Sequence, residues 1–365
     1  MFDQNHYVPI LKWRMGEYQA LLHLKNGIAD WVTPLIEIPT EGWDFENEEP
    51  SKSLDDHLSP FGKRLNAKWG DATCFIDSPY LDAQAKMKSG THHLEHIFEL
   101  ARAKDCQAIP VAGLRRHAAY ISAVRRIIKE DDRGVCIRLA QEDFNEALEV
   151  KLDRLLDDLK TDMDTVDLVI DLADGIVAST NTQALVWKAL LDQLPYLNDW
   201  NTLTIAGTSF PSSLPAATFR PSGRVPRYEW LAYQRLINTH KLERIPSFGD
   251  YATSHPVTAS MDPRMLDPNA KIKYTIDNDS LIVVGKQVKL NGRGQYVDLC
   301  KSLLAMNPAV FAGAAYSWGD KYIADCVTKT VGTGGTSTWP TVATNHHITK
   351  AVRNLANFHG TLPSP

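Results

Sequence analysis

The sequence predicts a (β/α)8 barrel of the TIM type, an α/β fold, with an elaborated C-terminal segment. Two observations support this fold class. Eight short apolar runs rich in β-branched residues recur before residue 252, and segments with apolar residues at helical spacing lie between them. Alternating strands and helices imply right-handed crossovers and a parallel sheet, and eight such units close a barrel. An open, doubly wound sheet is the alternative, but no Gly-x-Gly-x-x-Gly motif follows the first run.

The predicted strands are short and apolar, as expected for strands that are buried on both faces. In chain order they run from Tyr7 to Lys12, Val32 to Ile38, Thr73 to Asp77, Ala108 to Gly113, Gly134 to Leu139, Val166 to Leu172, Leu203 to Gly207 and Ile245 to Asp250. The predicted helices run from Glu17 to Ile28, Pro60 to Trp69 (the weakest pattern), His92 to Lys104, Ala118 to Lys129, Asn145 to Leu159, Gln183 to Leu194 and Tyr228 to Asn238. We therefore assign residues 1–251 to the barrel strands.

The pattern changes in residues 252–365, which we assign to a C-terminal extension. Two strand-like runs, Ile272 to Ile276 and Leu281 to Val284, flank a turn-forming Asp-Asn-Asp and predict a β-hairpin. Predicted helices follow from Gln295 to Leu304, Asp320 to Val327 and His346 to Phe358. Because the extension follows the eighth strand, we expect one of its helices to complete the outer ring. The rest should cap the carboxyl ends of the strands.

Bulk properties exclude several classes of protein. The 365 residues are 44% hydrophobic and 23% charged, as in a soluble globular protein, and a net charge of −5 provides no overall basic field for nucleic acid. The five cysteines are widely spaced and include no C-x-x-C pair, which favours a reducing cytoplasm over a zinc or disulfide framework. No signal peptide and no run of 18 apolar residues is visible, so we expect a cytoplasmic protein without a membrane partner.

The predicted strands end in polar or charged residues, at the positions where barrels of this type carry their reactive groups. These residues are Lys12, Glu37, Asp77, Arg115 with Arg116, Arg138, Asp171, Thr208 with Ser209, and Asp250. Four of them lie within or flush with the apolar runs, where a helix-capping role is less natural: Lys12, Glu37, Arg138 and Asp171. The ring of charged residues either lines a ligand site or forms a layer of structural ion pairs.

The mixed charges of this ring bear on the reaction class. Its acidic members are Glu37, Asp77, Asp171 and Asp250, and its basic members are Lys12, Arg115 and Arg138. Carboxylates could hold a divalent cation such as Mg or Mn, while the cations could bind a phosphate, a combination that suits phosphoryl or phosphodiester chemistry. Alternatively, the opposite charges neutralise one another and no metal binds. The loop that begins at Gly207 supplies the hydroxyls of Thr208 and Ser209 where many barrels bind phosphate, unless it is simply rich in serine.

Two motifs of the extension supply further candidates. Ser317-Trp318-Gly319-Asp320 opens a predicted helix, and either Ser317 or Asp320 could be a plain helix cap. Asn345-His346-His347 opens the last predicted helix, and a histidine near a carboxylate ring is a candidate acid or base. The alternative is a capping asparagine followed by packed or exposed rings. We predict His346 as a catalytic candidate, and Trp13, Trp318, Asp320, Asn345 and His347 as ligand contacts.

Two other patterns favour a simple surface explanation. His92 and His96 are one helical turn apart, as in a metal-binding pair, but the sequence offers no third ligand. A basic stripe from Arg115 to Lys129 resembles a phosphate-binding surface, although the acidic residues at 130–132 dilute it. A solvated helix start and a solvated helix face are the preferred interpretations.

Several stretches resemble the Beta protein family of phages, satellite phages and prophages. They are Pro9-Ile-Leu-Lys12-Trp13-Arg-Met-Gly16-Glu17-Tyr18, Thr33-Pro34-Leu35-Ile36-Glu37-Ile38-Pro39, Ser317-Trp318-Gly319-Asp320 and Asn345-His346-His347-Ile348. The resemblance extends from about residue 7 to about residue 358. It implies a role in defence of the host cell against other phages and names no catalytic residue.

Three functions compete within this context. In the first, the protein is an effector hydrolase that grips phosphates with Lys12 and Arg138, takes an acid or base from Glu37, Asp77, Asp171 or His346, and uses the extension as a lid. In the second, it is a sensor that recognises a nucleotide, a nucleic acid or a phage product and signals to a partner protein from the same defence locus. In the third, the barrel is a scaffold for a partner. The sequence does not identify the substrate, the metal or the oligomeric state.

Overall fold

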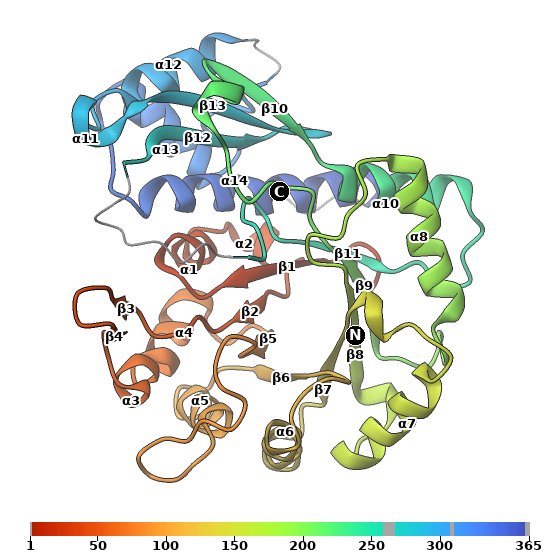
Figure 1. Cartoon of the computed structure of the whole chain (residues 1–365). Coiled ribbons are helices and arrows are strands. Elements are labelled where there is room, and N and C mark those ends of the chain that lie inside the picture. Colours follow the sequence, from red (N-terminus) through yellow and green to blue (C-terminus); the bar gives the residue numbers. More distant parts are fainter. Residues whose placement is uncertain (1, 258–266, 307–309, 362–365) are drawn as a thin grey trace.

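Eight parallel strands form a closed barrel, which confirms the predicted fold class (Figure 1). The computed structural model describes residues 2–257, 267–306 and 310–361. Around the barrel the order is β1-β11-β9-β8-β7-β6-β5-β2, back to β1. The strands are β1 (Tyr7–Lys12), β2 (Leu35–Glu37), β5 (Cys74–Asp77), β6 (Ala108–Ala112), β7 (Val135–Leu139), β8 (Val166–Asp171), β9 (Thr202–Ala206) and β11 (Ser247–Asp250). Each lies within one predicted run, except that β9 begins one residue earlier, at Thr202.

Helices surround the barrel and bury their apolar faces against the outward side chains of the strands. They are α1 (Met15–Leu22), α2 (Asn26–Ala29), α3 (Leu54–Leu58), α4 (Phe61–Trp69), α5 (His93–Arg102), α6 (Ala118–Asp131), α7 (Leu148–Leu159), α8 (Thr180–Gln193), α10 (Tyr228–Thr239) and α14 (Thr338–His359). Short 3-10 turns lie at Gln141–Asp143 and Met163–Thr165. The last helix, α14, packs on α1 and β1 and so completes the outer ring from the C-terminal extension, as expected.

Side-chain alternation along the strands decides which residues enter the barrel. Apolar side chains fill its interior, among them Val8, Ile10, Leu35, Phe75, Val111, Cys136 and Val169. Because side chains alternate, the side chain two residues after an inward-pointing one also points inward. At the carboxyl ends these next inward positions are Lys12, Glu37, Asp77, Arg138 and Asp171. Lys12, Glu37 and Asp77 are direct neighbours across β1, β2 and β5, so the charged residues form one layer above the apolar core.

A second, smaller unit lies on the outer side of α14 (Figure 1). The predicted hairpin is present as β12 (Asn269–Thr275) and β13 (Asp279–Gln287), and β10 (Ser222–Pro226) pairs with β13 as a third antiparallel strand. The helices α9 (Ala216–Phe219), α11 (Val288–Asn291), α12 (Tyr296–Met306) and α13 (Trp318–Val327) complete this unit. Its core includes Ile272, Leu303, Ile323 and Val342, the last from α14. Helix α14 therefore contributes side chains both to the core around the barrel and to the core of the smaller unit.

The last helix starts earlier than predicted, and this changes the position of a candidate site. The sequence predicts a start at His346, whereas α14 begins at Thr338. The glycines before residue 338 and Pro340 suggest a loop. Proline is nevertheless tolerated in the first turn of a helix, because a backbone N–H at that position would have no acceptor within the helix. His346 and His347 therefore lie mid-helix and buried, so the predicted position at a helix start is wrong.

Candidate functional site

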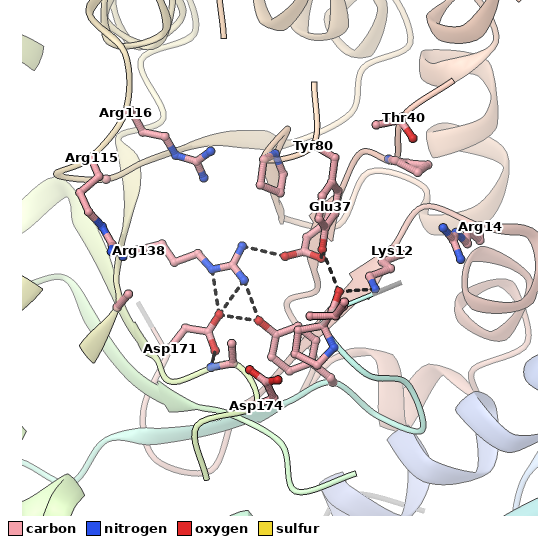
Figure 2. Close-up of a pocket in the computed structure, with 18 of the residues that line it drawn as sticks. Lys12, Arg14, Glu37, Thr40, Tyr80, Arg115, Arg116, Arg138, Asp171 and Asp174 are labelled. Carbon is pink, nitrogen blue, oxygen red and sulfur yellow. Dashed lines mark hydrogen bonds and ion pairs between the residues drawn. The ribbon is translucent and has the colours of Figure 1, made fainter. Parts of the chain in front are cut away.

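A cavity of about 1010 Å³ opens at the carboxyl ends of the barrel strands (Figure 2). Loops that follow β1, β2, β5, β6, β7, β8 and β11 all contribute to its wall. Its charged lining comprises Lys12, Arg14, Glu37, Glu41, Arg115, Arg116, Arg138, Asp143, Asp171 and Asp174. The predicted charged ring thus lines a cavity, with two exceptions: Asp77 lies beneath the floor and Asp250 points away.

Arg138 is the centre of the cavity floor. Its Nη1 lies 2.9 Å from Glu37 Oε1 and 2.9 Å from Asp77 Oδ2, and its Nη2 lies 2.6 Å from Asp171 Oδ2 (Figure 2). Nε donates a further bond of 2.9 Å to Asp171. Burial alone would lower the pKa of Arg138, but Tyr251, Asp171, Glu37 and Asp77 together raise it well above its usual range. One cation therefore joins carboxylates from three other strands.

Asp77 is fully buried under this floor and links it to a second arginine. Arg116 Nη2 lies 2.6 and 2.7 Å from the two oxygens of Asp77. The Tyr120 hydroxyl donates to the same carboxylate over 3.3 Å. Burial alone would lower the pKa of Arg116, but the neighbouring Asp77 carboxylate raises it above its usual value. Asp77 therefore acts as a support for Arg116 and Arg138, and it does not line the cavity.

The remaining carboxylate oxygens of the floor also have donors. Tyr80 donates to Glu37 Oε2 over 2.8 Å, and Tyr251 donates to Asp171 Oδ2 over 2.6 Å. The backbone N–H of Ala173 donates to Asp171 Oδ1 over 2.8 Å. Burial and the neighbouring carboxylate raise the pKa of Tyr251 well above its usual range, so it remains a neutral donor. The ring is thus both an ion-paired layer and the floor of a ligand-sized cavity.

Residues 251–257, which we call the strap, form one wall of the cavity and are held by two lysines, of which Lys12 is buried and Lys273 is half-buried. Lys12 Nζ donates to the carbonyls of His255 and Pro256 over 2.8 and 2.5 Å. Lys273 of β12 donates to Thr253 O over 2.7 Å. Burial lowers the pKa of Lys12 and lowers that of Lys273 to about 8. The strap therefore connects the barrel floor with the smaller unit.

Glu17 of α1 anchors the strap from the other side and provides a pH-dependent test. Ser254 Oγ donates to its Oε1 over 3.0 Å, while Oε2 is buried and has no hydrogen-bond partner among the described residues. Burial raises the pKa of Glu17 to about 7, against the opposing effects of Ser254, Lys12 and Arg14. A carboxyl whose pKa is higher in the folded than in the unfolded state costs stability once the pH rises through the folded value.

The substitution Glu17→Gln should therefore raise the free energy of unfolding at pH 8 by about 2–3 kcal/mol, as expected for a carboxyl whose pKa is shifted from 4.5 to about 7. The gain over the wild type should shrink as the pH falls from 8 to 5. Urea unfolding at several pH values measures this difference. The exposed Glu146→Gln serves as control and should show no such trend. A pH-independent difference between Glu17→Gln and wild type would contradict the prediction.

Of the two alternatives for the charged ring, the structure shows ion pairing, and the four carboxylates do not converge. Asp250 points out of the barrel, and the oxygens of Glu37, Asp77 and Asp171 already accept bonds from Arg138, Arg116 and tyrosine hydroxyls. Among the residues that the structure describes, no three His, Cys, Asp or Glu side chains converge as metal ligands. The electrostatic partner of these carboxylates in this fold is arginine.

Asp250 belongs to a separate buried cluster between β11 and α14, which corrects its predicted place in the cavity. Tyr7 donates to its Oδ1 over 2.5 Å, His347 Nε2 lies 3.0 Å from Oδ2, and Arg227 Nη2 lies 3.6 Å away. His347 Nδ1 is 2.8 Å from Thr275 Oγ1. Burial opposes ionisation of Asp250, but His347, Arg227 and Tyr7 hold its pKa below the usual range. His347 joins barrel, helix and smaller unit.

His346, Asn345 and Asp320 form the adjoining part of this contact, so their predicted place in a lid facing the charged ring is wrong. His346 Nδ1 lies 2.8 Å from Asp320 Oδ2 and its Nε2 lies 2.7 Å from Thr275 O. Asn345 accepts from Gly319 N and donates to Ala20 O, each over 3.0 Å. None of these side chains reaches the cavity. Because α14 runs between barrel and smaller unit, its polar residues tie the two together.

Four other predicted ligand contacts also lie outside the cavity. Trp13 points outward and packs on Tyr18 and Phe61. Trp318 stacks on His23, with ring centroids 4.1 Å apart. Thr208 and Ser209 are engaged locally: Thr208 accepts from Phe210 N over 3.0 Å, and Ser209 donates to Glu229 over 2.5 Å. The two tryptophans pack against neighbouring elements, the two hydroxyls bond within their own loop region, and none of the four lines the cavity.

The imidazoles of the histidine pair share no hydrogen-bond partner among the described residues, but His92 is buried at the start of α5, so the predicted solvated helix start is wrong for this residue. His92 caps α5 and lies 2.9 Å from Ala83 O, whereas His96 pairs with Glu99 over 3.3 Å. Arg126 of α6 pairs with Glu95. At the start of the stripe, however, Arg115 and Arg116 turn into the cavity.

Several cavity residues were missing from the predicted site. Tyr251 forms part of the floor, Arg14 lies exposed beside Lys12, and Tyr80 covers Glu37. Trp43 lies on the short hairpin β3 (Trp43–Asp44) and β4 (Glu49–Pro50), is 48% exposed, and lines the mouth. Alternation beyond Gly249 could have indicated Tyr251. Trp43 carries no periodic signal, because its hairpin is an insertion between β2 and α3.

The described residues contain no helix that is both long and apolar enough to cross a membrane. No curated protein matches the chain. Solved structures with similar folds include triosephosphate isomerase from Bartonella henselae, at 10% identity and a TM-score of 0.35 over 67% of this chain and 92% of that one. A variant tryptophan synthase α-subunit from Pyrococcus furiosus matches at 13% identity and a TM-score of 0.28, over 57% of this chain and 89% of that one. The barrel assignment itself rests on the strand order.

The family comparison covers almost the whole chain. The model of the Beta protein family matches residues 7–353, which include the barrel, the strap, the smaller unit and most of α14. The motifs around Lys12, Glu37, Asp320 and His346 all lie inside this range. The chain belongs to the Beta protein family.

Proposed function

We propose that this protein recognises a phosphate-bearing nucleotide ligand in the barrel cavity, and that it acts by this recognition in defence against phages. The supporting observation is the chemistry of the cavity wall. Arg14, Arg115 and Arg116 reach it from two loops, and the aromatic rings of Trp43 and Tyr80 line its mouth. Guanidinium groups bind phosphate oxygens in pairs of hydrogen bonds, and exposed aromatic faces stack on bases.

Recognition fits the floor of the cavity better than hydrolysis does. A general base needs a side chain that is free to take a proton from water. The carboxylate oxygens of Glu37 and Asp171 instead accept hydrogen bonds from Arg138, Tyr80, Tyr251 and a backbone N–H. A floor with its charges already paired is rigid, and rigidity favours selective binding. The signal would then pass to a partner protein from the same defence locus.

Binding and turnover must be measured together to test this proposal. Calorimetric titration of the full chain with AMP, GMP, ATP and GTP should give binding, and chromatography with Mg or Mn present should find the nucleotides intact. Arg115→Ala should weaken binding about tenfold, the loss of one charge-assisted contact, and should abolish protection in a plaque assay. Arg126→Ala, an exposed arginine on α6, should change neither.

The same experiments identify the competing functions. Nucleotide products that disappear on Glu37→Gln would establish the hydrolase and overturn the recognition proposal. Full protection by Arg115→Ala and Trp43→Ala, combined with no binding of any probe, would favour the scaffold.

A further inference from the structure

The cations of the cavity are distributed in two groups on opposite sides. Lys12 and Arg14 come from β1 and the residues just after it, while Arg115 and Arg116 follow β6. In the order β1-β2-β5-β6 these strands are three places apart in a ring of eight, and so lie nearly across the barrel. Figure 2 shows the two groups at either side of the pocket, with Arg138 and Glu37 between them.

The centre of the cavity does not attract an anion as strongly as its two sides. Arg138 is shared by Glu37, Asp77 and Asp171, so its charge is already compensated. Arg14 is exposed and forms no ion pair with any described residue. Arg115 is 60% exposed, and its partners Glu142 and Asp143 lie 3.5 and 3.2 Å away. The pair with Glu142 is exposed on both sides and contributes little. Asp143 is buried and contacts Nε of Arg115, while most of the arginine side chain stays exposed to the cavity.

The acidic residues of the wall leave Arg14 on one side and Arg115 on the other as the cations that face the cavity. Asp143 pairs with Arg115, and Asp174 lies 3.4 Å from the imidazole of His255 in the strap. Glu41 is half-buried in the cavity wall. Each side can therefore take one anionic group, and the paired floor between them separates the two.

The size and shape of the cavity limit the ligand further. At about 1010 Å³ it lies at the upper end of the range of small-molecule sites, roughly 300–1000 Å³, so a single phosphate leaves most of it empty. The apolar core of the barrel closes it from below, which prevents a continuous nucleic-acid strand from passing through. At the mouth, the indole of Trp43 is half exposed and contacts no other ring among the described residues. That ring offers a stacking face for a base.

We infer that the ligand carries two separate phosphate groups and at least one base, as a linear or cyclic dinucleotide does. It spans the cavity from Arg14 to Arg115, with a base on Trp43. This inference rests on the proposed nucleotide recognition and specifies its ligand class.

Calorimetric titration with matched probes tests the two-sided site. The probes are 5′-phosphorylated diadenylate and diguanylate, cyclic diadenylate and cyclic diguanylate, with AMP and GMP as single-phosphate references. At least one dinucleotide should bind tenfold or more tightly than its mononucleotide, since a second charge-assisted contact contributes about a factor of ten. A preference for the linear or the cyclic probe then shows which kind of dinucleotide the cavity binds.

Variants on each side give the sharper test. Arg14→Ala and Arg115→Ala should each weaken dinucleotide binding about tenfold, whereas only one of them should weaken AMP binding. Trp43→Ala should weaken both, and Trp43→Phe should restore most of the loss. Arg126→Ala is the matched control, and thermal unfolding checks that each variant is folded.

Equal affinity for mononucleotides and dinucleotides, or a dinucleotide response to only one of the two sides, would overturn the inference and leave the proposed function intact. A folded protein that binds none of the probes would overturn both.

Discussion

Replacing Arg138 with alanine should lower the free energy of unfolding by about 3–5 kcal/mol, because breaking a buried ion pair leaves uncompensated charge behind. Glu37, Asp77 and Asp171 share this one arginine, at distances of 2.6–2.9 Å, and all three are at most 5% exposed. In the variant their negative charges face one another across the cavity floor, where water screens them poorly. Urea unfolding at pH 7, followed by far-UV circular dichroism, measures the loss.

Two further variants make this result interpretable. Arg126→Ala removes an arginine whose side chain is 53% exposed, and its effect should stay within about 0.5 kcal/mol. Adding Asp171→Asn to Arg138→Ala removes one of the stranded charges and should recover part of the loss. A single variant at Arg138 that is as stable as the wild type would show that the floor does not depend on the shared cation.

Asp320→Ala should have an effect of similar size, about 3–5 kcal/mol, at the contact between α14 and α13. The carboxylate accepts from His346, from Ser317 Oγ over 2.6 Å and from Tyr274 over 2.7 Å, all in buried surroundings. Without the carboxylate, each of these buried donors loses its hydrogen-bond partner and gains no water molecule in its place. Hydrogen exchange should show the amides of α13 and β12 losing protection before those of the barrel strands.

The pH dependence and a neighbouring residue provide the controls. Burial opposes ionisation of Asp320, but His346, Ser317 and Tyr274 hold its pKa below the usual range. A depressed folded pKa contributes stability that is present above the unfolded value and lost as pH falls through the folded one. The cost of Asp320→Ala should therefore shrink below about pH 4. Asp325→Ala removes an exposed pair with Lys321 on the same helix and should cost far less.

Alternation of side chains explains which part of the site was predictable. Lys12, Glu37, Arg138 and Asp171 each lie in the last two residues of an apolar run at an inward position, so the runs themselves indicated a charged layer. Asp250 ends its run too, but it shares the outward face with Phe248. The inward face of β11 passes through Gly249, which has no side chain, and emerges as Tyr251. When glycine occupies the inward position of a strand, the sequence does not show which residues of that strand point into the barrel.

The extension was harder to place, because its polar residues are buried for structural reasons. His346 and Asp320 have the residue types of an acid–base pair, and no local pattern distinguishes that role from a buried hydrogen-bonded contact. The distinction depends on which surface of α14 meets the barrel, a matter of packing between distant parts of the chain. β10 escaped prediction for the same reason: it gains its partner, β13, from more than fifty residues downstream.

The position of α14 also constrains the order of assembly. Residues 251–337 separate the eighth strand from the helix that completes its unit, and that helix packs on α1 and β1 at the opposite end of the chain. On the ribosome, the first helix and strand must wait for residues near 340 before their outer surface is covered. Contacts between such distant segments slow folding and leave apolar surface exposed to other chains in the meantime. Synthesis halted before residue 338 should therefore yield an aggregating barrel, which makes the addition of α14 the step that commits this protein to its native state.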